Sequence, residues 1–168
     1  KQEIEICELE GHVNDPIFVD AILNDQEVPI HGDGTQTRSM AYVDDLVEGT
    51  LLAMENENAV GEVINLGNDE EISVIDTAYL IHEVAQTGNE LKLKYIPMKE
   101  IFGKYKDIMR RVPDLTKAYS LLGYKPKIDM KEAIRRIIGL RRNAILKDTQ
   151  IPKPSSVDYQ EDVSATAP

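Results

Sequence analysis

The chain has 168 residues, enough for about one domain, and its composition (42% hydrophobic, 29% charged) is typical of a globular protein and argues against wholesale disorder. Nineteen basic residues against 30 acidic ones leave a net charge of −11, which argues against nucleic acid as the main partner. The single cysteine, Cys7, excludes a disulfide framework and fits a cytoplasmic protein. No apolar run approaches the length of about 18 residues that a membrane helix needs.

Helices are predicted where apolar residues recur at helical spacing behind a capping residue. Ser73 and Asp129 are expected as caps, as is either Asp44 or Asp45. The expected helical ranges are 14–24, 44–54, 73–88, 113–123 and 129–142.

Extended segments lie between these helices, and a tight turn at Gly32-Asp33-Gly34 requires positive φ angles. The expected extended ranges are 28–31, 38–42, 61–66, 91–96 and 125–128. The sequence therefore predicts a mixed α/β fold. It also predicts an acidic leader or edge strand over residues 1–13, one domain over residues 14–142 and a flexible tail over residues 143–168.

Charge is unevenly distributed along the chain. Residues 1–90 hold 21 acidic side chains and only two basic ones, Lys1 and Arg38, whereas residues 104–142 hold 12 basic and four acidic ones. We expect the two parts to meet in the fold as surfaces of opposite sign. In so acidic a chain, an anion site has to be built locally from a few arginines.

Three stretches carry a resemblance: VPIHGDGTQTRSMAYVDDLVEGT (28–50), GEVINLGN (61–68) and RRVPDLTKAYSLLGYKP (110–126). Together they resemble the carboxy-terminal, substrate-binding half of the NAD-dependent nucleotide-sugar epimerases and dehydratases, which are extended short-chain dehydrogenases. Within that family, the chain is most similar to the group of UDP-glucuronate decarboxylase, dTDP-glucose dehydratase and UDP-glucose epimerase. The resemblance covers roughly residues 14–142 and implies a small mixed α/β substrate-binding domain, with the Rossmann half largely absent.

The resemblance implies specific site residues. In the family, the arginine of the Gly-Asp-Gly-x-x-x-Arg stretch reaches the substrate's diphosphate, and that position is Arg38. A second diphosphate arginine precedes the Pro-Asp step, where Arg110 and Arg111 stand, and Arg111 is the better match. The family's base-lining strand brings in Pro29, Ile30 and His31, and Asn65 falls in a family motif near the site.

The family's NAD-binding and catalytic features are not matched. No Gly-x-x-Gly-x-x-Gly or Gly-x-Gly-x-x-Gly opens a helix after a strand. Tyr95 and Lys99 have the spacing of the family's catalytic pair, but Pro97 would break the helix that such a pair needs. NAD is thus implied for the complete enzyme and is not expected on this chain alone.

Other candidate sites are weaker. The three histidines, His12, His31 and His82, share no metal-ligand spacing, and Cys7 has no basic neighbour to activate it. No metal site is predicted.

Three hypotheses for the function remain open. The chain is the nucleotide-sugar-binding part of an epimerase, dehydratase or decarboxylase, inactive without its NAD-binding half. Alternatively, it is a non-catalytic module that binds a UDP- or dTDP-sugar, or an interaction protein with a vestigial pocket. For the first, we expect an exposed apolar face that binds a Rossmann-containing half or a second copy of the chain.

Overall fold

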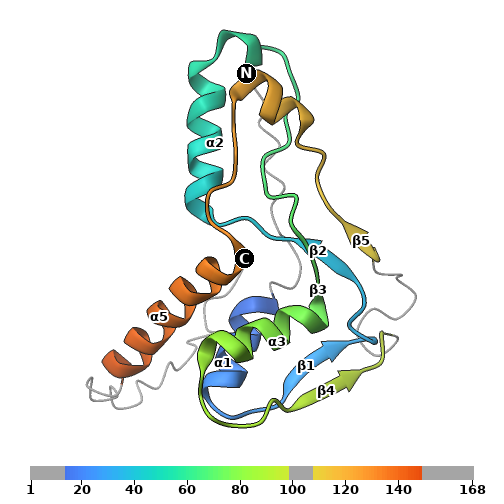
Figure 1. Ribbon diagram of the computed structural model, residues 1–168, viewed down its shortest axis with the longest axis vertical. Coiled ribbons are helices and arrows are strands. Elements are labelled where there is room, and N and C mark those ends of the chain that lie inside the picture. Colours follow the sequence, from blue (N-terminus) through green and yellow to red (C-terminus); the bar gives the residue numbers. More distant parts are fainter. Residues whose placement is uncertain (1–13, 99–107, 149–168) are drawn as a thin grey trace, which may run out of the picture.

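The structure, a computed structural model, describes residues 14–98 and 108–148. One end of the molecule packs three helices against a two-stranded parallel sheet (Figure 1). The helices are α1 (Asn14–Leu23), α3 (Val74–Ala85) and α5 (Met130–Asp148), and the strands are β1 (Val28–His31) and β4 (Leu93–Ile96). Their buried residues form one hydrophobic cluster that includes Phe18, Ile30, Ile81 and Ile134. Full burial of each such side chain contributes about 1.5–3 kcal/mol.

The other end of the molecule is built on α2 (Val43–Glu55), with a 3-10 turn η1 (Glu57–Ala59) and a π-helical turn η2 (Ala118–Leu122) (Figure 1). A second, smaller cluster fills this end, with Leu115, Leu122 and Tyr124 among its buried residues. Gly49 lets α2 pack closely against Tyr124, because a Cβ at this position would lie 2.9 Å from the Tyr124 ring. The described residues therefore form two hydrophobic clusters.

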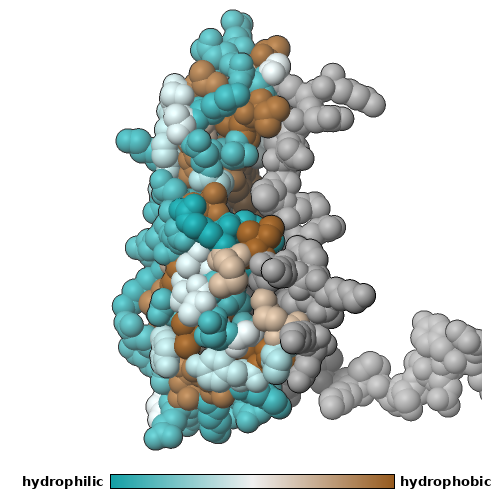
Figure 2. All heavy atoms as spheres, turned by 90° about the vertical axis from the view of Figure 1, so that its right-hand side faces the viewer, coloured by the Kyte–Doolittle hydropathy of each residue, from teal (hydrophilic) through white to brown (hydrophobic). Residues whose placement is uncertain are grey.

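A three-stranded sheet lies between the two ends of the molecule (Figure 1). Its order is β3 (Glu71–Ser73), β2 (Thr37–Ser39) and β5 (Arg110–Arg111). β2 pairs antiparallel with β3 and parallel with β5. On the side of the molecule that carries β4 and β5, hydrophilic side chains cover most of the surface and hydrophobic ones gather in separate clusters (Figure 2).

Several predictions from local sequence are confirmed. Gly32 and Gly34 have φ angles of +69° and +77° in the predicted turn. The Ser73 side chain caps α3 by accepting from the backbone N–H of Asp76, and Asp129 caps α5 by accepting from that of Glu132. The mixed α/β architecture agrees with the expected fold class.

Other predictions are wrong. Residues 61–66 form no strand, while β3 and β5 were not predicted. Neither Asp44 nor Asp45 caps α2, since its N-cap is Tyr42, which makes no side-chain capping bond. α5 continues to Asp148, so residues 143–148, expected as the start of a flexible tail, are helical. The expected leader 1–13 and the remaining tail 149–168 lie outside the described residues.

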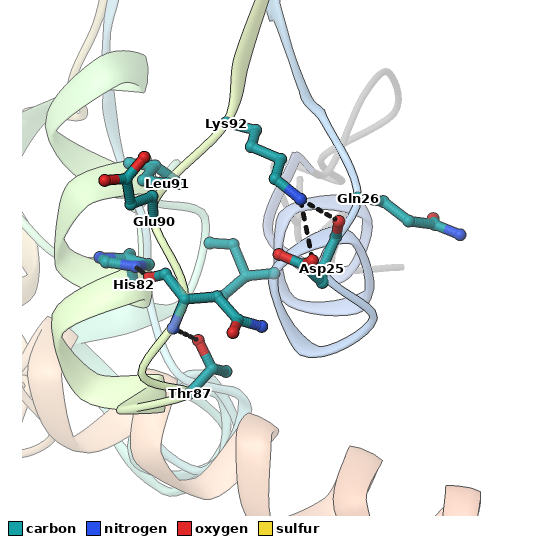
Figure 3. A pocket seen from close by; sticks show the side chains of 9 residues that line it. Asp25, Gln26, His82, Thr87, Glu90, Leu91 and Lys92 are labelled. Atoms are coloured by element: carbon teal, nitrogen blue, oxygen red, sulfur yellow. Dashed lines mark hydrogen bonds and ion pairs between the residues drawn. The ribbon is translucent and has the colours of Figure 1, made fainter.

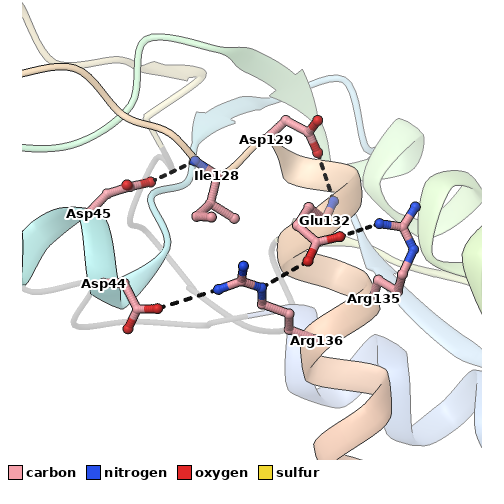
Figure 4. A network of polar contacts seen from close by, with 7 residues as sticks. All are labelled: Asp44, Asp45, Ile128, Asp129, Glu132, Arg135 and Arg136. Carbon is pink, nitrogen blue, oxygen red and sulfur yellow. Dashed lines mark hydrogen bonds and ion pairs between the residues drawn. The ribbon is translucent and has the colours of Figure 1, made fainter.

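The Asp45 carboxylate has a different role from capping. It is buried, with 2% of the residue exposed, and accepts a backbone N–H bond from Lys127 (3.0 Å). It accepts a second one from Ile128 (3.1 Å; Figure 4). Residues 127 and 128 belong to the segment that runs from η2 to α5. Asp45 therefore ties the first turn of α2 to the connection between the two clusters.

We expect the Gly34→Ala substitution to lower the free energy of unfolding by about 2–4 kcal/mol, measured by urea denaturation. The added Cβ would be held at φ +77° and would lie 2.9 Å from the side chains of Ile30 and Ile75. The matched control is Gly88→Ala, which has φ +80° and no atom within 4 Å, and should cost about 1 kcal/mol. Equal losses for the two variants would contradict the close approach at Gly34.

The Asp45→Asn substitution should lower the free energy of unfolding by about 2–3 kcal/mol. The Asn amide has a single, uncharged oxygen, so it cannot accept both backbone N–H bonds as the two carboxylate oxygens do. Asp44→Asn is the matched control, since the Asp44 side chain is exposed and is 3.4 Å from Arg136; it should change stability by at most about 0.5 kcal/mol. A comparable loss in both variants would show that Asp45 has no special role.

Candidate functional site

The three stretches that carry the family resemblance meet around β2. The Ser39 hydroxyl, next to Arg38, donates to the backbone carbonyl of Asn68. The side-chain amide of Asn65 donates to the backbone carbonyl of Asp114 over 3.1 Å. The first and third stretches are in direct contact, because β2 pairs with β5. Segments far apart in the sequence thus converge at one place in the fold.

The register of this pairing places two arginines side by side. Arg38 of β2 and Arg111 of β5 are direct partners in the parallel ladder. Direct partners on neighbouring strands point to the same face of a sheet and have backbones about 4.8 Å apart. The side chains of Arg38 and Arg111 therefore leave the same face of the sheet from adjacent positions, and both carry a positive charge.

The surroundings of the two guanidinium groups differ. The Arg38 side chain is half-buried, and its Nη1 donates to the backbone carbonyls of Thr37 and Ile108, each over 2.8 Å. These bonds fix the plane of the guanidinium. Arg111 is also half-buried, and within residues 14–98 and 108–148 its guanidinium makes no hydrogen bond or ion pair. The charge of Arg111 is thus unbalanced by a direct partner in that part of the chain.

Arg110 points to the opposite face of the sheet. It is the ladder partner of Thr37, and its guanidinium binds Glu71 Oε2 through Nε (3.1 Å) and Nη2 (2.9 Å). The structure therefore separates the two neighbouring arginines and places only Arg111 beside Arg38.

The residues of β1 divide in the same alternating way. The Ile30 side chain is fully buried in the first cluster, while Pro29 and His31 are half-buried on the other face. The Gln36 side chain donates to the backbone carbonyl of His31 over 2.9 Å and links β1 to the start of β2. Only Pro29 and His31 present side chains away from the core.

Hydrogen bonds shift the pKa values of several groups near the three stretches. Thr116, through its hydroxyl and then its backbone N–H, lowers the pKa of Asp114. Burial and the carboxylate of Asp69 raise the pKa of Tyr119 to about 12, because the phenol donates to Asp69 Oδ2 over 2.7 Å. Asp114 therefore stays ionised and Tyr119 stays protonated at neutral pH.

Comparison with known proteins supplies the family. The model of the GDP-mannose 4,6 dehydratase family matches residues 14–137. The chain belongs to the NAD-dependent epimerase/dehydratase family.

Curated relatives of this chain include proteins named as UDP-sugar decarboxylases. The chain is 32% identical over 124 residues to UDP-N-acetyl-alpha-D-glucosaminuronate decarboxylase of Bacillus cytotoxicus, a match that covers 73% of this chain and 38% of that protein. It is 35% identical over 133 residues to UDP-glucuronic acid decarboxylase 1 of Arabidopsis thaliana, covering 79% of this chain and 28% of that protein. The chain thus spans about a third of the length of these relatives.

Solved structures of the family share the fold. UDP-glucuronic acid 4-epimerase from Bacillus cereus, in complex with UDP-glucuronic acid and NAD, matches with a TM-score of 0.70 and 26% identity over 79% of this chain and 40% of that chain. UDP-glucose 4-epimerase from Thermotoga maritima, with UDP-glucose, matches with a TM-score of 0.67 and 31% identity over 82% of this chain and 41% of that chain. The mixed α/β fold is therefore that of a fragment of an epimerase/dehydratase.

The other candidates have ordinary structural surroundings. Tyr95 lies in β4 and not on a helix, and Lys99 lies outside the described residues. His82 lines a small hollow between the ends of α1 and α3, where its Nε2 is 2.7 Å from the backbone oxygen of Asn89 (Figure 3). No residue of the three stretches lines this hollow.

Neither a metal-binding cluster nor a membrane-spanning helix occurs in the parts of the chain that the structure describes. No group of three or more His, Cys, Asp or Glu side chains there could hold a metal ion. No helix among the same residues has the length and apolar character needed to cross a membrane.

Sequence reasoning missed three residues that shape the site. Thr37 and Ser39 flank Arg38 and contact the neighbouring segments, and Glu71 binds both Thr37 and Arg110. Alternation along β2 could have placed Thr37 and Ser39 on one face. Glu71 sits in the acidic run Asp69-Glu70-Glu71, and only the pairing of β3 with β2 distinguishes it from its neighbours.

Proposed function

We propose that this chain is the nucleotide-sugar-binding portion of an NAD-dependent epimerase, dehydratase or decarboxylase, with the substrate's diphosphate bound by Arg38 and Arg111. The in-register pairing of these two residues on one sheet face is the observation that carries the proposal. Planar guanidinium groups bind phosphate oxygens bidentately, and two of them match the two phosphates of a nucleoside diphosphate.

The proposed ligand is a UDP- or dTDP-sugar. Relatives and structural neighbours whose names include UDP-sugars support this class. Pro29 and His31 are proposed to line the nucleotide base, since they are the side chains of β1 that face away from the core. Asn65 is proposed to shape the site through its bond to the backbone of Asp114 and not by direct contact.

The chemistry is assigned to another part of the enzyme. NAD would be bound outside this chain, which is proposed to have no turnover alone. The protein is proposed to act in the cytoplasm, in agreement with its single cysteine.

An exposed apolar stripe on α2 supports the idea of a further partner. Val43, Val47, Leu51 and Met54 recur at helical spacing, and more than half of each is exposed. Residues 63–66, which follow α2 in the sequence, alternate in exposure like a strand, with Ile64 and Leu66 packed against the second cluster. They nevertheless pair with no strand in the described chain. We propose that the NAD-binding half covers this surface, and that a second copy does so when that half is absent.

We expect calorimetric titration with UDP, dTDP and a UDP-sugar to show saturable binding that Arg38→Ala or Arg111→Ala weakens by about 10- to 100-fold, through loss of charge-assisted hydrogen bonds. Arg135→Ala is the matched control, because it removes the same charge from the exposed surface of α5, where Arg135 pairs with Glu132. The control should bind like the wild type.

Two outcomes would contradict this prediction. Absence of binding by the wild-type chain would remove the proposed function. Unchanged affinity in both arginine variants would show that any binding site lies elsewhere and would leave the interaction-protein hypothesis.

A second prediction concerns the α2 stripe. In sedimentation velocity, the wild-type chain should self-associate with rising concentration, and Leu51→Glu should abolish this by placing a charge in the apolar stripe. Leu140→Glu is the control, since Leu140 is 66% exposed on α5, outside the stripe. A monomeric wild-type chain over a wide concentration range would rule out the second copy as an occupant.

A further inference from the structure

β5 is a two-residue strand at the edge of the sheet, so few backbone bonds hold it there. The backbone N–H of Thr37 donates to the carbonyl of Met109 over 2.8 Å, just before the strand begins. Because successive residues of a strand point to opposite faces, Arg111 can lie beside Arg38 only while Arg110 lies on the other face. A shift of the register by one residue would exchange the two arginines.

One carboxylate on that other face contacts both neighbouring strands. Glu71 of β3 accepts the Thr37 hydroxyl of β2 at Oε1 (2.5 Å) and the Arg110 guanidinium of β5 at Oε2 (2.9 Å from Nη2). Its two oxygens are thus divided between β2 and β5. The Thr37 hydroxyl and then the Arg110 guanidinium lower the pKa of Glu71, which is therefore ionised at neutral pH.

We propose that Glu71 is a positioning residue for the diphosphate site: through Arg110 and Thr37 it fixes the register of β5 and so places Arg111 beside Arg38. This inference rests on the proposed function, because it concerns the same binding site. Glu71 lies on the opposite face from the two site arginines and acts without touching the ligand.

The expected effect is modest, because the ion pair is exposed (67% for the Arg110 side chain and 31% for that of Glu71). Loss of such a pair changes an equilibrium by up to about fivefold. Such a change in free energy is small compared with the stability of the whole fold, but it is large compared with the few bonds that hold a two-residue strand. We therefore expect the register of β5, and not global stability, to respond.

The test compares Glu71→Gln with Glu70→Gln, which makes the same change at the adjacent exposed residue. We expect Glu71→Gln to weaken UDP binding by about three- to fivefold and to speed hydrogen exchange at the Thr37 amide, with an unchanged urea midpoint. Glu70→Gln should match the wild type in all three measurements. The charge swap Glu71→Arg with Arg110→Glu should recover part of the lost affinity.

A double-variant cycle separates positioning from a general loss of structure. If Glu71 acts through Arg111, then Glu71→Gln combined with Arg111→Ala should bind UDP no more weakly than Arg111→Ala alone. Additive losses would overturn the proposal, as would a Glu71→Gln variant with wild-type affinity and exchange. Both results presuppose a wild-type chain that binds UDP, so they overturn the positioning role alone. Absence of wild-type binding overturns the proposed function and this role together.

Discussion

The arrangement of the two clusters depends on the hydrogen bonds that the buried Asp45 carboxylate accepts from the segment before α5. A buried charge is costly unless it is hydrogen-bonded, and here two backbone N–H groups and the amino-terminal end of α2 stabilise it. Because α2 starts soon after β2, fixing the first turn of α2 also limits where Arg38 can lie. A buried carboxylate outside the sheet thus contributes to the position of the site.

The uneven charge of the sequence becomes a set of contacts between its two parts. Basic residues after position 104 pair with acidic residues before position 90 in several places, among them Lys127 with Glu48, Lys131 with Glu83 and Arg136 with Asp44. Arg136 also lies over the ring of Tyr42, 5.1 Å from its centroid. Exposed ion pairs contribute little stability individually, so their main effect is on how the segments fit together. Lys131 and Arg136 of α5 are thus paired with carboxylates of this chain.

Local features of the fold could be predicted from the sequence, and long-range ones could not. The turn at Gly32 and Gly34 and the caps Ser73 and Asp129 depend on residues within one or two turns of chain. β5 consists of two arginines, a composition with no strand signal, and exists because β2 lies beside it. For the site, sequence reasoning gave both arginine candidates, but only the strand register shows that Arg110 and Arg111 face opposite ways. Residues 61–66 have a strand pattern, yet the described chain offers them no partner.

The two sides of α2 have different surroundings. One side packs Gly49, Leu52 and Ala53 on the second cluster, and the other exposes the apolar stripe that includes Leu51. A helix that is apolar on two sides is suited to the interior of a larger core, which the described residues do not provide. The pairing of Arg38 with Arg111, by contrast, is made within this chain. The pair of arginines proposed for the diphosphate is therefore complete within this chain, whereas the apolar stripe of α2 is left uncovered by the described residues.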